Sequence, residues 1–230
     1  MGSTESGTLV RQAAMNTRTT GVGYLHCIVL LALIVSGWQP VDRQTWLIEN
    51  VLVLVGAVAV WTTRKQFYWS RRSWIMVIGF LCLHEVGTHF TYPEVPYNSA
   101  VYLISGMDVN AAFGWERNQY DRFVHLAYGL LLSVPLREIV SEKCHLKGAW
   151  ASLIAWSLVL STSMLYELME WAGAAYAGGG DSAFVGAQGD VWDAQKDMAV
   201  AAAGSLVVLI CRGHALRDKV SALRGRLTPN

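Results

Sequence analysis

Charged side chains are scarce in this chain, and its few cysteines have no metal-binding or redox spacing. Asp, Glu, Lys and Arg make up 15% of the 230 residues, against roughly 25% in an average soluble domain. The four Cys are scattered without a C-x-x-C pair, which argues against a thiolate site and against a disulfide framework. Low charge together with 53% hydrophobic residues indicates a membrane protein.

Several catalytic motifs are also missing. His84-Glu85 does not continue to a second His at the H-E-x-x-H spacing, because His89 comes one residue late, about 100° around a helix. There is no G-x-S-x-G nucleophile motif and no Walker-type phosphate loop. Basic residues are spread over several loops, so a nucleic-acid partner is not indicated.

Long apolar runs are what the chain has instead. Runs of about 20 residues suffice to cross a bilayer as helices, and six occur, over Gly21 to Trp38, Trp46 to Thr62, Ser73 to Tyr92, Tyr120 to Leu136, Trp150 to Trp171 and Trp192 to Cys211. Pro135 is expected to kink or end the fourth run, and residues 97–118 are expected to hold a helix in the membrane interface. The sequence predicts an all-α polytopic integral membrane protein with six transmembrane helices, the last four forming a bundle.

The distribution of charge predicts which way the chain crosses the membrane. Fourteen of the 18 Lys and Arg lie before the first run, after the second, after the fourth and after the sixth, whereas 13 of the 17 acids lie on the opposite side. Basic loops mark the cytoplasmic face. Residues 1–20 are thus predicted to be a cytoplasmic tail, 21–211 the transmembrane domain, and 212–230 a basic cytoplasmic tail.

Ionisable residues recur at the predicted outer ends of four of these helices. They are His84, Glu85 and His89 in the third, Asp121 and His125 in the fourth, Glu167 and Glu170 in the fifth, and Asp193 and Asp197 in the sixth. Within each helix an i,i+3 or i,i+4 spacing places a pair on one face. Because ionisable groups are costly at membrane depth, they indicate a functional site. We expect these side chains to meet in one site at the outer face.

Such a concentration of carboxylates has to be compensated. The groups repel one another and lose hydration, so they must be protonated, be paired with a cation or bind a metal. Arg122 and Lys196 offset two charges, and the remaining imidazoles and carboxylates suit a divalent metal such as Zn²⁺ or Mn²⁺. The expected ligands are a subset of His84, Glu85, His89, Asp121, His125, Glu167 and Asp193. Glu170 or Asp197 is expected to be left as the catalytic general base.

Four motifs resemble the YjdF-like family of bacterial inner-membrane proteins. They are His84-Glu85-Val86-Gly87-Thr88-His89-Phe90-Thr91-Tyr92-Pro93, Tyr120-Asp121-Arg122-Phe123-Val124-His125, Tyr166-Glu167-Leu168-Met169-Glu170-Trp171 and Gly189-Asp190-Val191-Trp192-Asp193-Ala194-Gln195-Lys196-Asp197. The resemblance implies a multi-pass protein of the bacterial inner (plasma) membrane, and it implies no particular reaction. A looser pattern of Asp-x-x-x-His, then Glu, then Asp-x-x-x-Asp is similar to VanZ-like proteins, which commonly have Asn where this chain has Asp197.

Three functions remain open from the sequence. The leading hypothesis is a metal-dependent hydrolase or transferase that acts on a lipid or lipid-linked substrate in the outer leaflet. The second is a proton- or cation-coupled transporter, and the third is a non-catalytic envelope protein whose polar cluster holds helices together. The inner halves of the last four helices almost lack ionisable groups, which favours a site reached from one side and so the first hypothesis. Nothing in the sequence indicates an oligomeric state.

Overall fold

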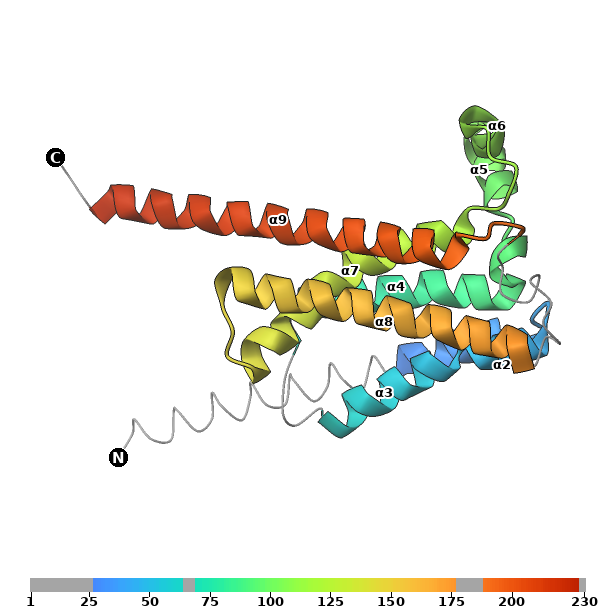
Figure 1. Cartoon of the computed structure of the whole chain (residues 1–230), viewed down its shortest axis with the longest axis horizontal. Coiled ribbons are helices and arrows are strands. Elements are labelled where there is room, and N and C mark those ends of the chain that lie inside the picture. The colour runs from blue at the N-terminus through green and yellow to red at the C-terminus, as the bar shows by residue number, and fades with distance from the viewer. Residues whose placement is uncertain (1–26, 64–68, 177–187, 228–230) are drawn as a thin grey trace.

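The computed structural model describes residues 27–63, 69–176 and 188–227, with side chains described up to Gly213. Every regular element in these ranges is a helix (Figure 1). The predicted tail over 1–20, the first residues of the first predicted span and the end of the predicted C-terminal tail lie outside the described residues.

Five helical segments are long and apolar enough to cross a membrane. They are Arg43–Thr63, Arg71–Phe90, Tyr120–Lys143, Gly148–Tyr176 and Asp193–Gly213. These five overlap the second to sixth predicted spans, which confirms an all-α polytopic membrane protein. The first predicted span is represented by a shorter apolar helix, Cys27–Ser36, so the total of six stays a prediction.

The second predicted span is two helices in the structure, α2 (Arg43–Glu49) and α3 (Val51–Thr63). Asn50 separates them, and its side-chain amide donates a 2.9 Å hydrogen bond to the carbonyl of Trp46. A short amide side chain that bonds its own backbone competes with the helical ladder. None of the described side chains of α3 is buried, so this helix contributes little to the core.

The helices of the fourth and sixth predicted spans extend well beyond their predicted ends. α7 (Tyr120–Lys143) runs through Pro135, so this residue does not end the helix, and the alternative expectation of a kink stays a prediction. A membrane-spanning helix tolerates proline because neighbouring groups can satisfy the freed backbone carbonyl. α9 (Asp193–Leu227) likewise continues past Cys211 into the region predicted as a basic tail.

The bundle is built around α7, which packs against α4 (Arg71–Phe90), α8 (Gly148–Tyr176) and α9 (Figure 1). Glycine allows α7 and α9 to touch. A Cβ at Gly129 would lie 2.0 Å from the carbonyl oxygen of Ala201, and one at Gly204 would lie 2.8 Å from that of Leu126. Small residues permit such close contact between membrane helices. The predicted bundle of the last four spans is therefore present, and its α7–α9 seam is tightly packed.

A short 3-10 helix, η1 (Tyr92–Glu94), and the helices α5 (Tyr97–Ser105) and α6 (Val109–Phe113) connect α4 to α7. In Figure 1, α5 and α6 stand out from the side of the bundle at one end. Tyr97 donates a 2.5 Å hydrogen bond to the side chain of Asn110, which ties the two helices together. The expected helix over 97–118 is thus a pair of short helices beside the bundle.

Candidate metal centre

Three aspartates converge where α7 and α9 begin. Asp121 lies in the first turn of α7, while Asp193 and Asp197 are one turn apart at the start of α9. One carboxylate oxygen from each lies within 4.8 Å of the other two. The side chains are buried, with residue exposures of 5%, 7% and 1%. The i,i+4 spacing on α9 turns both of its aspartates toward α7, so the predicted convergence of these helices is observed.

Two oxygens of this aspartate trio lack hydrogen-bond donors. Within the described part of the chain, neither Oδ1 of Asp121 nor Oδ1 of Asp197 has a hydrogen-bond partner. A buried acceptor without a donor costs roughly 1–3 kcal/mol, and more when it is charged. Both oxygens belong to residues that are more than nine-tenths buried. They are therefore suited to accept a cation.

His125 joins the trio to α8. Its Nε2 lies 3.6 Å from Oδ1 of Asp121 and 3.2 Å from Oε1 of Glu167. Its Nδ1 is 3.4 Å from the hydroxyl of Ser163. Glu170, which follows Glu167 three residues later on α8, is close enough for the two carboxyl groups to interact. Four of the predicted ligands (Asp121, His125, Glu167, Asp193) and both predicted bases thus lie in one neighbourhood.

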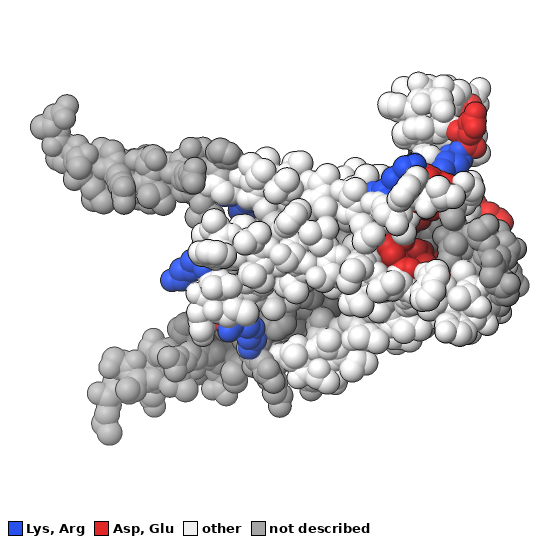
Figure 2. All heavy atoms as spheres, viewed as in Figure 1, with Lys and Arg blue, Asp and Glu red and all other residues white. Residues whose placement is uncertain are grey.

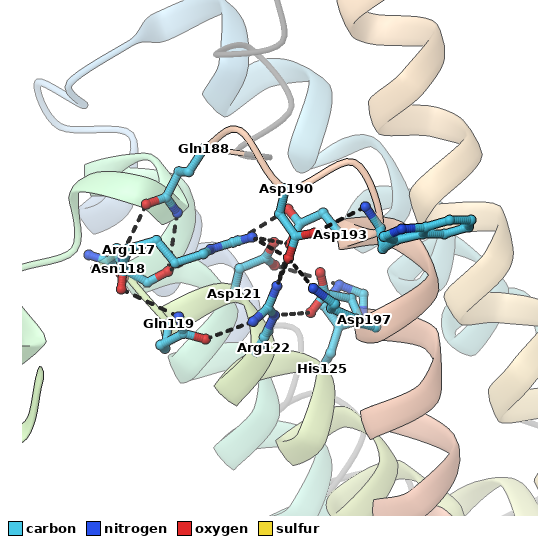
Figure 3. A network of polar contacts seen from close by, with 12 residues as sticks. Arg117, Asn118, Gln119, Asp121, Arg122, His125, Gln188, Asp190, Asp193 and Asp197 are labelled. Atoms are coloured by element: carbon cyan, nitrogen blue, oxygen red, sulfur yellow. Dashed lines mark hydrogen bonds and ion pairs between the residues drawn. The ribbon is translucent and has the colours of Figure 1, made fainter. Parts of the chain in front are cut away.

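Basic residues surround the trio on the side of the loops (Figure 3). Arg117 donates to both carboxylate oxygens of Asp193, with 3.1 Å between Nη2 and Oδ2. Arg122 contacts Asp193 at 3.2 Å and reaches Asp197 at 3.9 Å. Burial opposes the charge of Arg117, but the hydrogen bond to Asp193 and the nearby carboxylates raise its pKa above the usual value.

Asp190 is the outermost acid of the group. Its Oδ2 accepts a 2.6 Å hydrogen bond from Lys196 and also contacts Arg122. Its Oδ1 accepts from the backbone N–H of Trp192 at 3.1 Å. The hydrogen bond from Lys196, followed by those from Trp192 and Arg122, holds the pKa of Asp190 well below its usual range. Asp190 is thereby compensated by direct contacts, whereas the ion-pair contact of Asp121 in the described structure is the 3.6 Å one with His125.

Two hydrogen bonds from one side chain link the two loops that carry these residues. The amide of Gln188 accepts from the backbone N–H of Asn118 at 2.9 Å and donates to its carbonyl at 3.1 Å (Figure 3). The loop before α9 is thus paired with the loop before α7. This pairing brings residues about 70 positions apart to the same end of the bundle.

His84 lies beside this neighbourhood but outside the trio. Its Nδ1 is hydrogen-bonded to the hydroxyl of Tyr92 at 2.6 Å. The ring of Tyr166 contacts both histidines, with 6.2 Å to His84 and 5.7 Å to His125 between ring centroids. This predicted ligand is therefore near His125 but is not among the residues whose ligand atoms meet in the trio.

Glu85 and His89 face another part of the molecule. The hydroxyl of Ser36 donates to Glu85, and Nδ1 of His89 lies 2.8 Å from the carbonyl oxygen of Ser36. Trp46 donates its indole N–H to the same hydroxyl at 3.0 Å. We call these contacts the Ser36 junction. It joins helix Cys27–Ser36 to α4, so in the structure these two predicted ligands hold two helices together.

The ligands and bases expected from the sequence leave out two residues of this end of the bundle. Arg117 was not assigned to the site, although it is one of only four basic residues on the predicted outer side. Glu49, at the end of α2, is 7% exposed, and in the described structure its Oε2 has no hydrogen-bond partner. A carboxylate at the edge of an apolar run was the available signal for Glu49.

Charge is unevenly distributed over the described residues. Figure 2 shows Asp and Glu gathered, beside some Lys and Arg, at the end that carries the trio, whereas mainly Lys and Arg are visible toward the opposite end. This separation agrees with the predicted division of basic and acidic residues between the two sides of a membrane. It places the trio at the acidic end.

Comparison with known proteins identifies the family. Residues 22–218 match the family described as "Predicted membrane protein (DUF2238)". The chain is 30% identical over 187 residues to "Inner membrane protein YjdF" of Escherichia coli (strain K12), covering 80% of this chain and 86% of that protein. No solved structure matches. Neither match bears on the looser resemblance to VanZ-like proteins, which stays a prediction. The four motifs therefore indicated the correct relationship, and the chain belongs to the DUF2238 family as a multi-pass protein similar to an inner membrane protein.

Proposed function

We propose that the protein is an enzyme that acts on a lipid or lipid-linked substrate, and that it binds a catalytic divalent cation between α7 and α9. The observation that carries this proposal is the pair of buried oxygens on Asp121 and Asp197 that have no hydrogen-bond donor in the described structure. They belong to a trio whose ligand atoms lie within 4.8 Å of one another. A cation would compensate charge that the fold otherwise leaves exposed to mutual repulsion.

The chemistry of the donors fits a hard or borderline metal. The trio offers carboxylate oxygens, and His125 and Glu167 stand next to Asp121 as further donors. Oxygen with imidazole suits Zn²⁺ or Mn²⁺. Asp197 belongs to the trio, so we assign it as a ligand, whereas Glu170 remains available as the general base.

A bound cation would polarise a phosphoryl or acyl oxygen and lower the pKa of a water molecule. Residues of the chain would position the reacting groups and accept the proton that the water molecule loses. Glu170, which lies beside Glu167 on α8, would receive that proton at a carboxylate oxygen. Arg117 holds Asp193 by a two-pronged contact, which fixes the direction in which that ligand points. The class of reaction supported is hydrolysis or group transfer at a phosphoryl or acyl centre.

A lipid substrate is supported by the pair of helices beside the site. Leu103, Ile104 and Phe113 on α5 and α6 are 85%, 89% and 66% exposed. These helices project sideways from the bundle (Figure 1), which would place them along the surface of a membrane spanned by the bundle. Exposed apolar side chains on short interfacial helices insert among lipid headgroups.

The packing beneath the trio argues against a transporter. A transported ion would need a path toward the opposite end, yet α7 and α9 touch through Gly129 and Gly204. Ser133 and Ser205, which are fully buried at this seam, hydrogen-bond each other at 2.7 Å. A closely packed seam with satisfied hydroxyls supports access from one side only.

Metal content tests the cation. Protein purified in detergent should contain about one equivalent of Zn or Mn by elemental analysis, and Asp121→Asn should lose it. The matched control is Asp108→Asn, because Asp108 caps α6 at the same end and is exposed. The proposal is wrong if wild-type protein repeatedly purifies without metal and binds none on titration, or if Asp121→Asn keeps its metal.

A melting curve distinguishes a functional trio from one that only clamps helices. In metal-stripped protein, Asp197→Asn removes a repelling charge and should leave the melting temperature unchanged or higher. If Asp197 instead serves as a structural partner of Arg122, breaking the pair should destabilise the protein by up to roughly 3–5 kcal/mol. A large drop in melting temperature would favour the hypothesis that the trio only holds helices together.

A further inference from the structure

At the end of the bundle opposite the trio, a cleft of about 540 Å³ lies between the start of α4 and the ends of α7 and the apolar part of α9. Its walls include Trp69 and two arginines, Arg137 from α7 and Arg212 from α9. Two acids, Glu138 and Glu142, also line it. We call it the arginine cleft.

The two arginines form no ion pair with any residue that the structure describes. Among the described residues, no carboxylate lies within ion-pair distance of Arg137 or Arg212, and the buried Nε of Arg212 has no hydrogen-bond partner. Arg137 is oriented by hydrogen bonds to the hydroxyl of Ser152 at 3.1 Å and to the carbonyl of Gly148 at 3.5 Å. The two guanidinium groups are close enough to repel each other. An anion between them would relieve that repulsion.

The acids of the cleft do not serve this purpose. Glu138 accepts hydrogen bonds from the backbone N–H and the hydroxyl of Ser70, at 3.0 and 2.8 Å, and from the hydroxyl of Ser73 at 2.7 Å. Its two oxygens are therefore committed to the start of α4. Glu142 is exposed, so water screens its charge. Among the described residues, neither acid forms an ion pair with Arg137 or Arg212, so both guanidinium groups stay available to an anion.

We propose that the arginine cleft binds the phosphate group of an anionic phospholipid, with Arg137 and Arg212 as its two ligands. Guanidinium groups bind phosphate oxygens in pairs and are preferred for that purpose. The two arginines stand near the ends of apolar spans that finish at Lys143 and Gly213. A bilayer places lipid phosphates at this depth, and basic clefts between membrane helices bind such headgroups. The cleft is separate from the trio, and this inference does not depend on the proposed function.

The test uses the full chain, delipidated in a neutral detergent, and measures its melting temperature against added ligand. Phosphatidylglycerol should stabilise wild-type protein in a saturable way, and phosphatidylcholine at equal concentration should not. Inorganic phosphate is the third ligand to be added in this experiment. If it stabilises as well as phosphatidylglycerol, the cleft takes free phosphate and the lipid assignment is overturned.

Variants locate the effect. Arg137→Gln and Arg212→Gln should each weaken the apparent affinity for phosphatidylglycerol by about tenfold or more, the loss expected for a charge-assisted hydrogen bond. Arg72→Gln is the matched control, since Arg72 is exposed at the start of α4, and it should respond like wild type. Unchanged affinity in both cleft variants would overturn the proposal. If a cleft variant fails to fold, Arg137→Lys is tested in its place. The comparison of the two lipids on wild-type protein is a further test, because the proposal is also overturned if wild type shows no preference for phosphatidylglycerol.

Discussion

Arg117, in the loop before α7, holds Asp193, the first residue of α9, by donating to both of its carboxylate oxygens. The two residues are 76 positions apart, and both side chains are largely buried, with exposures of 13% and 9%. Asp193 belongs to the trio, so this pair orients one of its three carboxylates. The loop that carries Arg117 also leads out of α6, which places the lateral helices under the same restraint.

Replacing Arg117 should therefore be costly. Arg117→Gln leaves Asp193 with Arg122 alone and should destabilise the protein by about 3 kcal/mol, the usual cost of breaking a buried pair. Unfolding in detergent measures it. The double variant with Asp193→Asn should be less destabilised than the two single variants summed, because the charge left unpaired is gone. Strict additivity would show that the pair is not coupled.

Because α7 and α9 touch at glycines, the effect of a Gly→Ala substitution on stability should depend strongly on its position. Gly129→Ala puts a methyl group 2.0 Å from the carbonyl oxygen of Ala201, so the helices must separate, at a cost of about 1–3 kcal/mol or more. Gly79→Ala in α4 is the control, because nothing lies within 4 Å of its Cβ position. The control should be neutral or slightly stabilising. Equal melting temperatures for both variants would contradict the close contact.

Asp190 predicts an acid-side change in stability. Its pKa in the folded protein lies below the usual 3.8, so its stabilising contribution is complete above that value and is lost as the pH falls through the lower folded pKa. Wild type should melt above Asp190→Asn by a constant margin between pH 7 and 5. The margin should close only below about pH 4. A margin that already shrinks between pH 6 and 5 would mean that Asp190 titrates near or above its ordinary range.

The orientation of the chain can be checked with thiol labelling. All four natural cysteines are exposed, and Cys144 lies between α7 and α8 at the basic end. With the other three replaced by Ser, Cys144 should resist an impermeant reagent in intact cells and react after lysis. Met107→Cys, between α5 and α6 and 54% exposed in the native residue, should label in intact cells of a cysteine-free variant. The reverse pattern would place the trio on the cytoplasmic side.

The sequence predicted the spans well because apolar length is a local property. At Pro135 the local rule for proline left a kink and a helix end open, and the structure excludes the helix end, because the packed surroundings of α7 let the helix continue. The prediction from sequence also treated residues 46–62 as one helix, since a hydropathy pattern does not register the competition between the Asn50 side chain and the backbone.

The site was predictable only in part for a related reason. The i,i+4 spacing correctly places Asp193 and Asp197 on one face of α9. The same spacing holds for Glu85 and His89, yet that face of α4 meets Ser36. Spacing defines which residues share a face, whereas the rotation of each helix in the bundle decides what that face contacts. The second property depends on the packing of the whole bundle.

The Ser36 junction also bears on the order in which the protein is assembled. Synthesis proceeds from the N-terminus, so Ser36 is made 49 residues before Glu85, its carboxylate partner. During that interval the end of helix Cys27–Ser36 has no α4 to bind. Trp46 of α2, which donates to the same hydroxyl, is made only ten residues after Ser36. The contact with Trp46 can therefore form before α4 exists, whereas the contact with Glu85 has to wait for α4.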